Sequence, residues 1–280
     1  MTPGAFLPHH ALVRADGASP ARWAVVLHGV FGSGANWRLF ATRLARSLPD
    51  WGFVLVDLRG HGASQHAPPP HTVRAAADDV LRLEASLGLR VDAIVGHSFG
   101  GKVALTMCGI RPAPVHAAFV LDSTPGARGP TGGTLDVLAF LQSVPQPLPS
   151  RERFVELALA TMDRATADWL AMHVRPAADG FRIRLDLAAI GDLLADYFAT
   201  DLWPVLEEGR GAHHHHVVVG GRSDVVTAAD RARLETLEAT TAGRLRLHVL
   251  DKAAHWVHVD DPTGLHDVLV AGLSSRAGSD

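Results

Sequence analysis

Four short, continuous apolar runs constrain the fold of this chain more than any other feature. They occupy residues 24–27, 53–56, 93–95 and 117–121. Runs of this length, bounded by glycine, proline or polar residues, are typical of strands buried on both faces of a parallel sheet. Between them, apolar residues recur at helical spacing, as over residues 37–48 and 73–87. The alternation predicts a doubly wound α/β fold.

The pattern changes after residue 124. A loop rich in glycine and proline (125–133) leads into a mostly helical region that extends to about residue 204. We expect helices at 135–144, 151–162, 165–174 and 187–198, and a short extended piece at 181–185. Strand-like runs resume at 217–219 and 245–250, with helices near 227–239 and 262–273. We therefore predict an α/β core of residues 1–124 and 205–280, interrupted by a helical lid at 125–204.

Composition excludes several classes of protein. With 280 residues and 47% hydrophobic content, the chain is sufficient for one large core. Its 26 basic and 29 acidic side chains leave a net charge of −3. This charge lacks the positive excess that is typical of proteins that bind nucleic acid or an anionic membrane. A single cysteine excludes an intramolecular disulfide framework and a multi-thiolate zinc site. No apolar run approaches a membrane span, and residues 1–12 lack a signal-peptide pattern, so we expect a cytoplasmic monomer or homodimer.

Residues 96–100 read Gly-His-Ser-Phe-Gly between a predicted strand (91–95) and a predicted helix (102–110). In this context the serine sits on a sharp, strained turn that projects its hydroxyl above the sheet. The flanking glycines let the chain fold back without Cβ clashes. An ordinary glycine-rich turn is the alternative, and the strand–turn–helix context disfavours it. We predict that Ser98 is a nucleophile.

A second glycine-rich segment, His-Gly-Val-Phe-Gly-Ser-Gly at residues 28–34, directly follows the first predicted strand. Backbone N–H groups converge near the nucleophile in such a segment. We predict that the amides of Val30 and Phe99 form an oxyanion hole. Nucleotide binding is disfavoured, because a Gly-Lys-Ser/Thr ending and a G-x-G-x-x-G pattern are both absent.

A serine nucleophile needs a general base and an acid that orients the base. In a fold of this kind the acid and then the histidine follow the nucleophile along the chain. Asp224 lies just beyond the predicted strand at 217–219, and His255 lies just beyond the strand at 245–250. Ligands bind at such strand ends in an open parallel sheet. We predict a catalytic triad of Ser98, Asp224 and His255.

Other residues compete for these roles. Asp122 also follows a predicted strand and could reach the histidine from the neighbouring position. His258 is an alternative base, although its expected role is structural, within a His-Trp-Val-His turn. Asp57 precedes the nucleophile in the chain and is expected to hold a loop together. Cys108 is expected to be a packed core thiol rather than a second nucleophile.

A run of four histidines occupies residues 213–216. If the run is extended, alternate side chains point to opposite faces, so at most two of them could share a metal ion. No Asp, Glu or His partner stands at metal-ligand spacing. We predict a solvated loop here, with no more than adventitious nickel or zinc affinity, and no metal site.

Four blocks of this sequence resemble the α/β-hydrolase superfamily, and within it the small esterases of the ABHD11 and YbfF type. The blocks are HGVFGS (28–33), DLRGHGAS (57–64), GHSFGGK (96–102) and HWVH (255–258). The resemblance implies an α/β-hydrolase fold, carboxylester hydrolysis with thioesters as related substrates, and no cofactor. The chain departs from the usual family pattern at Phe99 (commonly Met), at Ala254 (commonly Gly) and over residues 121–125. The first two departures alter the shape of the pocket more than the chemistry.

These observations predict a serine esterase that acts on a small-molecule ester with a small to medium acyl or alcohol group. Aromatic side chains are the candidates for lining its pocket: Phe31, Phe140, Trp169, Tyr197, Phe198, Trp203 and Trp256. Each is also compatible with a plain core position. Cofactor-free perhydrolase or C–C bond hydrolase activity on the same triad is the main alternative. A ligand-binding protein with negligible turnover is another alternative, because fold does not determine function.

Overall fold

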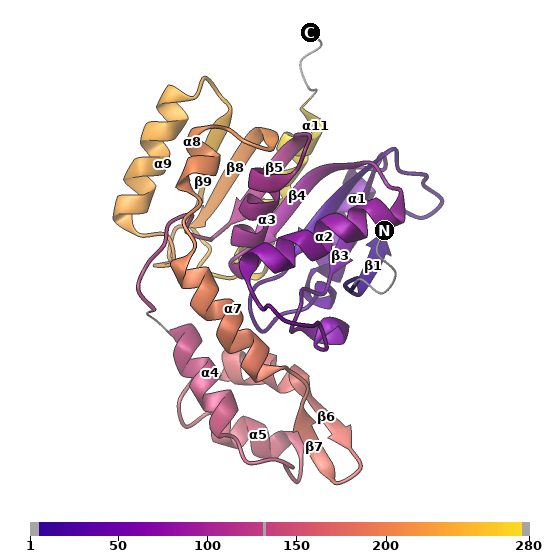
Figure 1. Ribbon diagram of the computed structural model, residues 1–280, viewed down its shortest axis with the longest axis vertical. Helices are drawn as coiled ribbons and strands as arrows, with labels where there is room; N and C mark the ends of the chain where they lie inside the picture. Colours follow the sequence, from indigo (N-terminus) through magenta and orange to yellow (C-terminus); the bar gives the residue numbers. More distant parts are fainter. Residues whose placement is uncertain (1–5, 131–132, 276–280) are drawn as a thin grey trace.

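The computed structural model describes residues 6–130 and 133–275, and its centre is a seven-stranded sheet (Figure 1). Strand β1 pairs antiparallel with β3, and all the other neighbours are parallel. In spatial order the strands are β1 (His10–Val13), β3 (Trp51–Val56), β2 (Arg22–Leu27), β4 (Val91–His97), β5 (Val115–Leu121), β8 (Ala212–Gly220) and β9 (Leu245–Leu250). The prediction of a doubly wound α/β fold is confirmed.

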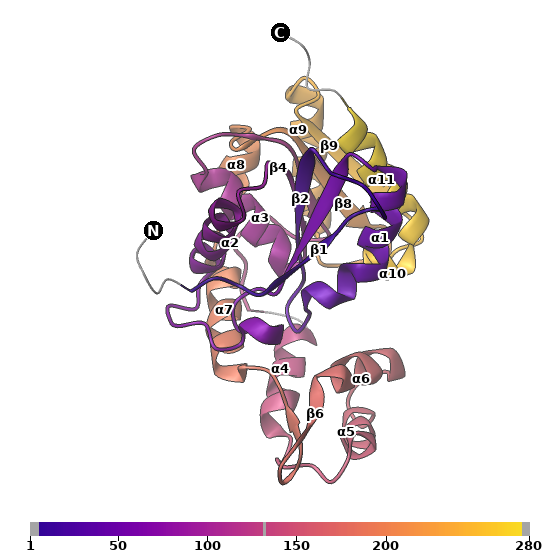
Figure 2. The same cartoon turned by 90° about the vertical axis from the view of Figure 1, so that its right-hand side faces the viewer.

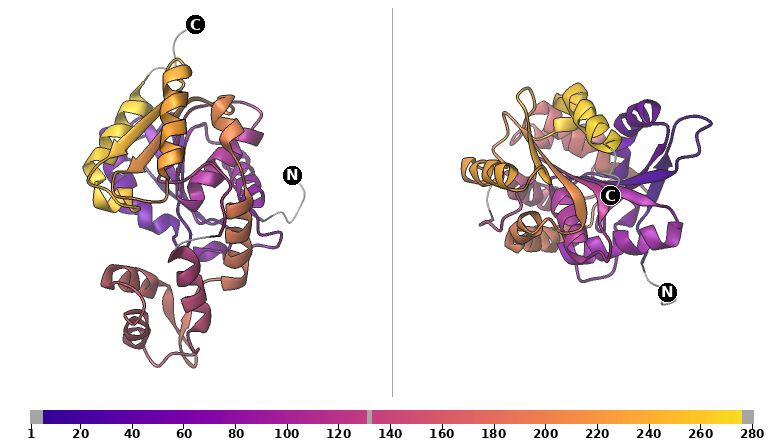
Figure 3. Two further views of the ribbon diagram at one scale, coloured as in Figure 1. Left: turned by 90° about the vertical axis from the view of Figure 1, so that its left-hand side faces the viewer. Right: turned by 90° about the horizontal axis from the view of Figure 1, so that it is seen from above.

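Helices cover both faces of the sheet, which is why its central strands are continuously apolar. Every residue of β3 and β5 is buried. One face packs against α1 (Arg38–Ser47), α10 (Val257–Asp260) and α11 (Pro262–Ser274). The other face packs against α2 (Val73–Leu87), α3 (Phe99–Ile110), α8 (Trp203–Glu207) and α9 (Ala228–Thr240). The view from above in Figure 3 shows the two layers. No helix within the described residues is long and apolar enough to cross a membrane.

Residues 133–199, which form most of the chain between β5 and β8, make a separate group of elements beyond one end of the sheet (Figures 1 and 2). It contains α4 (Gly133–Ser143), α5 (Arg151–Ala158), α6 (Arg164–Leu170), α7 (Leu187–Ala199) and the antiparallel hairpin of β6 (Val174–Ala177) and β7 (Gly180–Ile183). The four helices lie where the apolar spacing predicts them. The extended piece expected at 181–185 overlaps β7. We call residues 125–204 the inserted segment.

One buried lysine attaches both ends of the inserted segment to the core. Lys102 of α3 is completely buried, and its ammonium donates to Gly126 O (2.9 Å), Tyr197 O (2.6 Å) and Thr200 O (2.8 Å). Gly126 lies where the chain enters the segment, and the other two carbonyls lie at the end of α7. Burial lowers the pKa of Lys102 to about 8. The helix that begins beside Ser98 is therefore bonded directly to the two connections of the segment.

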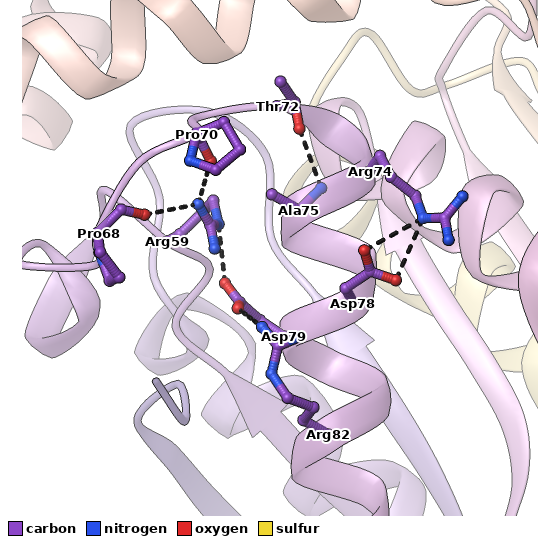
Figure 4. Close-up of polar contacts among 9 residues, drawn as sticks. All are labelled: Arg59, Pro68, Pro70, Thr72, Arg74, Ala75, Asp78, Asp79 and Arg82. Atoms are coloured by element: carbon purple, nitrogen blue, oxygen red, sulfur yellow. Dashed lines mark hydrogen bonds and ion pairs between the residues drawn. The ribbon is translucent and has the colours of Figure 1, made fainter. Parts of the chain in front are cut away.

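A buried arginine holds the long loop after β3 against α2 (Figure 4). The Nε of Arg59 donates to Asp79 Oδ2 (2.8 Å), and its Nη1 donates to the carbonyls of Pro68 and Pro70. Arg82 binds the other carboxylate oxygen of Asp79. Burial raises the pKa of Asp79, while the two arginines act in the opposite direction. These bonds therefore fix the loop after β3, which also contacts the loop after β2.

The prediction of a solvated loop at residues 213–216 is wrong. The four histidines lie within β8, between β5 and β9. His213 is exposed, but His215 and His216 are buried at 1% and 5% exposure. The His216 ring stacks on Phe119 with ring centres 4.6 Å apart. A neutral imidazole is a flat, weakly polar ring that can be buried against other rings. The histidines can therefore occupy the same buried strand as the apolar residues that follow them. Within 6–130 and 133–275, no group of three or more His, Cys, Asp or Glu side chains is placed to hold a metal ion.

Burial of these histidines makes stability sensitive to acid. Burial lowers the pKa of His215 to about 4 and of His216 to about 3, whereas an unfolded histidine titrates at about 6.5. Below that value the unfolded chain binds more protons than the folded chain, so the free energy of unfolding falls as the pH falls. Each such group contributes up to about 1.4 kcal/mol per pH unit. We predict that His216→Phe makes the decline between pH 6 and pH 4.5 shallower, as measured by urea unfolding.

The matched control for this experiment is His213→Phe, which changes an exposed position of the same strand. This variant should keep the wild-type dependence on pH. An equal slope in wild type and His216→Phe would contradict the assignment of a buried, neutral imidazole at position 216.

Candidate active site

Ser98 lies on a strained turn between β4 and α3. Its backbone angles are φ 53° and ψ −117°, in the left-handed range of φ that residues with a side chain rarely adopt. The two flanking glycines are required by close contacts. A Cβ on Gly96 would lie 2.1 Å from the Gly100 carbonyl oxygen, and one on Gly100 would lie 2.5 Å from Leu27 O. The predicted strand–turn–helix arrangement around Ser98 is present.

Strained backbone gathers around this turn. Besides Ser98, the non-glycine residues with positive φ in the described ranges are Phe31, Asp122 and Ala242. Phe31 belongs to the glycine-rich loop after β2, and Asp122 follows β5. Such strain persists only where surrounding contacts hold it, and it concentrates at functional sites. Three strand ends, those of β2, β4 and β5, therefore carry strained residues at the same edge of the sheet.

The two amides predicted to form an oxyanion hole come from the loop after β2, which carries Val30, and from the start of α3, which carries Phe99. His28 holds this loop, because its Nε2 accepts from Leu58 N (3.0 Å) and its Nδ1 donates to Gly29 O (2.7 Å). Burial lowers the pKa of His28 to about 4, which keeps the ring neutral for both bonds. Val30 and Phe99 line one cavity together with Ser98. Within the described residues, neither the Val30 nor the Phe99 amide donates a hydrogen bond.

His255 is bonded to Asp122. Its Nδ1 lies 2.7 Å from Asp122 Oδ2, and the imidazole is partly exposed to the cavity that Ser98 also lines. Asp122 is completely buried, and its other oxygen accepts from Gly220 N (3.0 Å). The Ser98 side chain makes no hydrogen bond within the described ranges. In ligand-free enzymes such bonds are often long and tighten only when substrate binds.

The structure does not place Asp224 against His255, contrary to the predicted pairing. Asp224 lies in the loop after β8 and is exposed. The preceding residue, Ser223, turns inward instead and donates from Oγ to Asp122 Oδ2 (2.5 Å). Asp122, considered above as the alternative, directly follows β5, whereas Asp224 lies further along the loop that follows β8. Both lie beyond the end of a strand, so strand-end position alone does not discriminate between the two carboxylates.

Two residues that sequence reasoning left without a role, Ser223 and His97, support the pair of His255 and Asp122. Ser223 supplies a third hydrogen bond to the Asp122 carboxylate. The Nε2 of His97 lies 2.8 Å from the His255 backbone carbonyl oxygen. Burial holds the pKa of His97 well below its usual range, so the ring is neutral and donates from Nε2. A polar residue in a turn, such as Ser223, carries no sequence signal for this role, whereas His97 stands next to the serine.

The other candidates have structural contacts. His258 stacks on Trp37 with ring centres 4.2 Å apart, and burial lowers its pKa to about 4. Asp57 accepts hydrogen bonds from Gly34 N (2.8 Å) and Ala63 N (3.0 Å), so it joins the loops after β2 and β3. Cys108 is buried, and burial raises its pKa to about 12.

Two cavities meet at Ser98. The larger has a volume of about 1070 Å³ and extends from Ser98 and His255 between the core and the inserted segment. Its wall is largely apolar, with side chains such as Val137, Phe140, Met162, Trp169 and Val259. The smaller, of about 310 Å³, also contains Ser98, Val30 and His255 in its wall. Ligand sites usually combine this kind of apolar volume with a few polar groups.

The predicted pocket residues divide between these cavities. Phe31, Phe140, Trp169 and Trp256 line the large cavity, and Tyr197 and Phe198 line the small one. Trp203 lines neither cavity. It is a buried residue at the start of α8, with the Arg233 guanidinium 4.2 Å from its ring centre. Helical spacing does not distinguish a core aromatic side chain from one that lines a pocket.

Three features together are typical of the α/β hydrolases. They are a serine on a sharp turn between a strand and a helix (the nucleophile elbow), two backbone amides without a hydrogen-bond acceptor within the described residues, and a histidine bonded to a carboxylate. All three lie at the carboxyl edge of the parallel sheet. Residues 24–268 match the model of the alpha/beta hydrolase family. The chain belongs to this family.

Known proteins resemble the chain over most of its length. It is 26% identical to the sn-1-specific diacylglycerol lipase ABHD11 of Mus musculus, covering 94% of this chain and 84% of the relative. The Xenopus tropicalis protein of the same name is 27% identical, covering 91% and 77%. Among solved structures, a marine microorganism esterase superposes with a TM-score of 0.77 at 22% identity, covering 95% of this chain and 99% of the other.

The contact of His255 with Asp122 leads to a direct comparison of two carboxylates. We predict that Asp122→Asn lowers kcat for p-nitrophenyl butyrate by about 10³- to 10⁴-fold, because the amide no longer stabilises the imidazolium or selects its tautomer. Asp224→Asn is the matched control, and it should lower kcat by less than about tenfold. A larger loss in Asp224→Asn than in Asp122→Asn would show that Asp224 is the orienting acid.

Proposed function

We propose that the protein hydrolyses carboxylic esters through Ser98, His255 and Asp122, with an acyl-enzyme intermediate. The observation that supports this proposal best is the 2.7 Å contact between His255 Nδ1 and the buried Asp122 carboxylate, beside the elbow serine. With Nδ1 committed to Asp122, Nε2 is left as the basic nitrogen. The triad then runs Ser98, Asp122, His255 in chain order, the order usual for this fold.

In the proposed reaction, Ser98 Oγ attacks the ester carbonyl while His255 takes its proton. Asp122 stabilises the imidazolium, and its three hydrogen-bond donors hold the carboxylate in place. The Val30 and Phe99 amides stabilise the oxyanion of the tetrahedral intermediate. His255 then protonates the leaving alcohol, and afterwards it activates the water that releases the acid.

The cavities favour a substrate with one extended apolar portion. The larger cavity, about 1070 Å³, lies at the upper end of the size range of small-molecule sites. Binding is favoured when a hydrocarbon chain of the substrate leaves water and packs against this apolar wall. The relatives named as diacylglycerol lipases act, by that name, on esters with acyl chains. We infer that this chain takes esters with a medium or longer acyl chain.

The inserted segment is proposed to act as the lid over this cavity. Trp169 of α6 lies against Trp256 of the core, with ring centres 5.2 Å apart. The Nε2 of His173 lies 2.6 Å from Phe31 O, in the strained loop after β2. Burial lowers the pKa of His173, so the neutral ring donates this bond. These contacts join the segment to the core beside the large cavity.

A ladder of p-nitrophenyl esters from acetate to palmitate tests this function. We expect kcat/KM to rise beyond butyrate, because longer chains bury more apolar area in the large cavity. Ser98→Ala should lower kcat by about 10⁴-fold or more on every ester, since the nucleophile is lost. Wild-type hydrolysis no faster than that of Ser98→Ala would reject the esterase function. It would favour C–C bond cleavage or a binding role.

A further inference from the structure

The smaller cavity at Ser98 differs in chemistry from the larger one. It shares Ser98, Val30 and His255 with the apolar cavity, so one reaction centre opens into two spaces. Its wall carries charged and polar side chains, including Arg128, Tyr197 and Asp224. A volume of about 310 Å³ is sufficient for a short substituent but not for the long chain that the other cavity accommodates.

Arg128 is the cation in this wall, and its surroundings hold it there. Its backbone N–H donates to Phe198 O (2.9 Å), and its Nη1 donates to Val225 O (3.0 Å). The guanidinium carbon lies 5.8 Å from the centre of the Phe198 ring. The side chain is therefore joined to the end of α7 and to the loop after β8, and both of these also line the cavity.

Several N–H groups of the Arg128 guanidinium have no acceptor within the described residues. Of its five N–H groups, one donates to a carbonyl, and the buried Nε has no acceptor within the described residues. No carboxylate in 6–130 or 133–275 forms an ion pair with Arg128. By contrast, the buried Arg59 is paired with Asp79 at 2.8 Å. A half-buried arginine without a counterion is suited to bind an anionic group of a ligand, bidentately where the geometry allows.

Two other charged groups modify the field in the cavity. Asp224 lines the same wall and would repel an anion, but its exposed carboxylate is screened by solvent more than a half-buried group is. The Lys102 ammonium lies 4.4 Å from the ring centre of Tyr197, another residue of the wall, and its donors are used by three carbonyls. Of the charged side chains at this cavity, Arg128 is therefore the one with donors left for a ligand.

We propose that the smaller cavity binds a short anionic portion of the ester substrate, carboxylate or phosphate, through Arg128. The longer apolar portion lies in the larger cavity. This inference rests on the proposed esterase function and specifies its substrate class as amphiphilic esters with one charged end. Arg128 is then a specificity-determining residue, and Asp224 opposes it.

Two matched pairs of esters test the proposal, each an acid compared with its neutral amide. Octanoyloxyacetate and octanoyloxyacetamide place the charge in the alcohol portion. Octyl hydrogen succinate and octyl succinamate place it in the acyl portion. We expect wild type to have a higher kcat/KM on the acid in at least one pair, and the preference to weaken as salt is added. Arg128→Gln should lower the acid-to-amide ratio by about tenfold or more, because a charge-assisted hydrogen bond is lost.

Variants of opposite charge separate a charge effect from a folding defect. Asp224→Asn should raise the acid-to-amide ratio of kcat/KM, because a negative charge is removed from the cavity wall. Arg128→Lys should keep part of the preference for the acid, because the positive charge remains but the paired N–H donors of the guanidinium are lost. A ratio that is equal in wild type, Arg128→Gln and Asp224→Asn for both pairs would overturn the proposal. If the amides and the p-nitrophenyl esters are hydrolysed in that case, the esterase function stands. If none of these esters is hydrolysed faster than by Ser98→Ala, the esterase function itself fails.

Discussion

The geometry of the reaction centre depends on the buried carboxylate of Asp122. It accepts from the backbone of Gly220, the hydroxyl of Ser223 and the ring of His255, so it joins the ends of β5, β8 and β9 at one point. A carboxylate removed from water is costly unless its oxygens are hydrogen-bonded, and this one has three donors. The same bonds that stabilise its charge also orient the histidine. Loss of any one of these donors would weaken both the stabilisation of the carboxylate charge and the orientation of His255.

The loops around the candidate site are held by further polar contacts, several of them from neutral histidines. His28 fixes the loop that carries Val30, His97 holds the backbone of His255, and His173 reaches the loop after β2 from the inserted segment. Burial lowers the pKa of each of these rings, so each is neutral and can donate from one nitrogen. A neutral imidazole can also accept at the other nitrogen, as His28 does, which a lysine or arginine at the same position could not.

The sequence predicts the six parallel strands of the sheet, because buried parallel strands leave unbroken apolar runs. It does not predict β1, a short antiparallel edge strand that is only partly buried. The sequence also identifies the elbow serine, since only glycine fits at positions 96 and 100. It does not determine which of two strand-end aspartates meets His255. That choice depends on the direction of one turn, where Ser223 points inward and Asp224 outward. The burial of the histidine run is likewise not evident from residue type, which indicates exposure, because the neighbouring strands and α11 cover these side chains.

In the proposed function, the inserted segment contributes to substrate choice through both cavities. Its helices and the chain just before them supply apolar side chains to the larger cavity, and they supply Arg128, Tyr197 and Phe198 to the smaller one. Ser98, His255 and Asp122 all belong to the core, where their positions are set by strand ends. Substitutions in the segment can therefore change the charge or volume of either cavity without moving the reacting groups. Lys102 limits this independence, because it bonds α3, the helix that starts at the elbow, to both ends of the segment. A displacement of α7 would break two of its three bonds, so the position of the segment and the order of the elbow helix are energetically coupled.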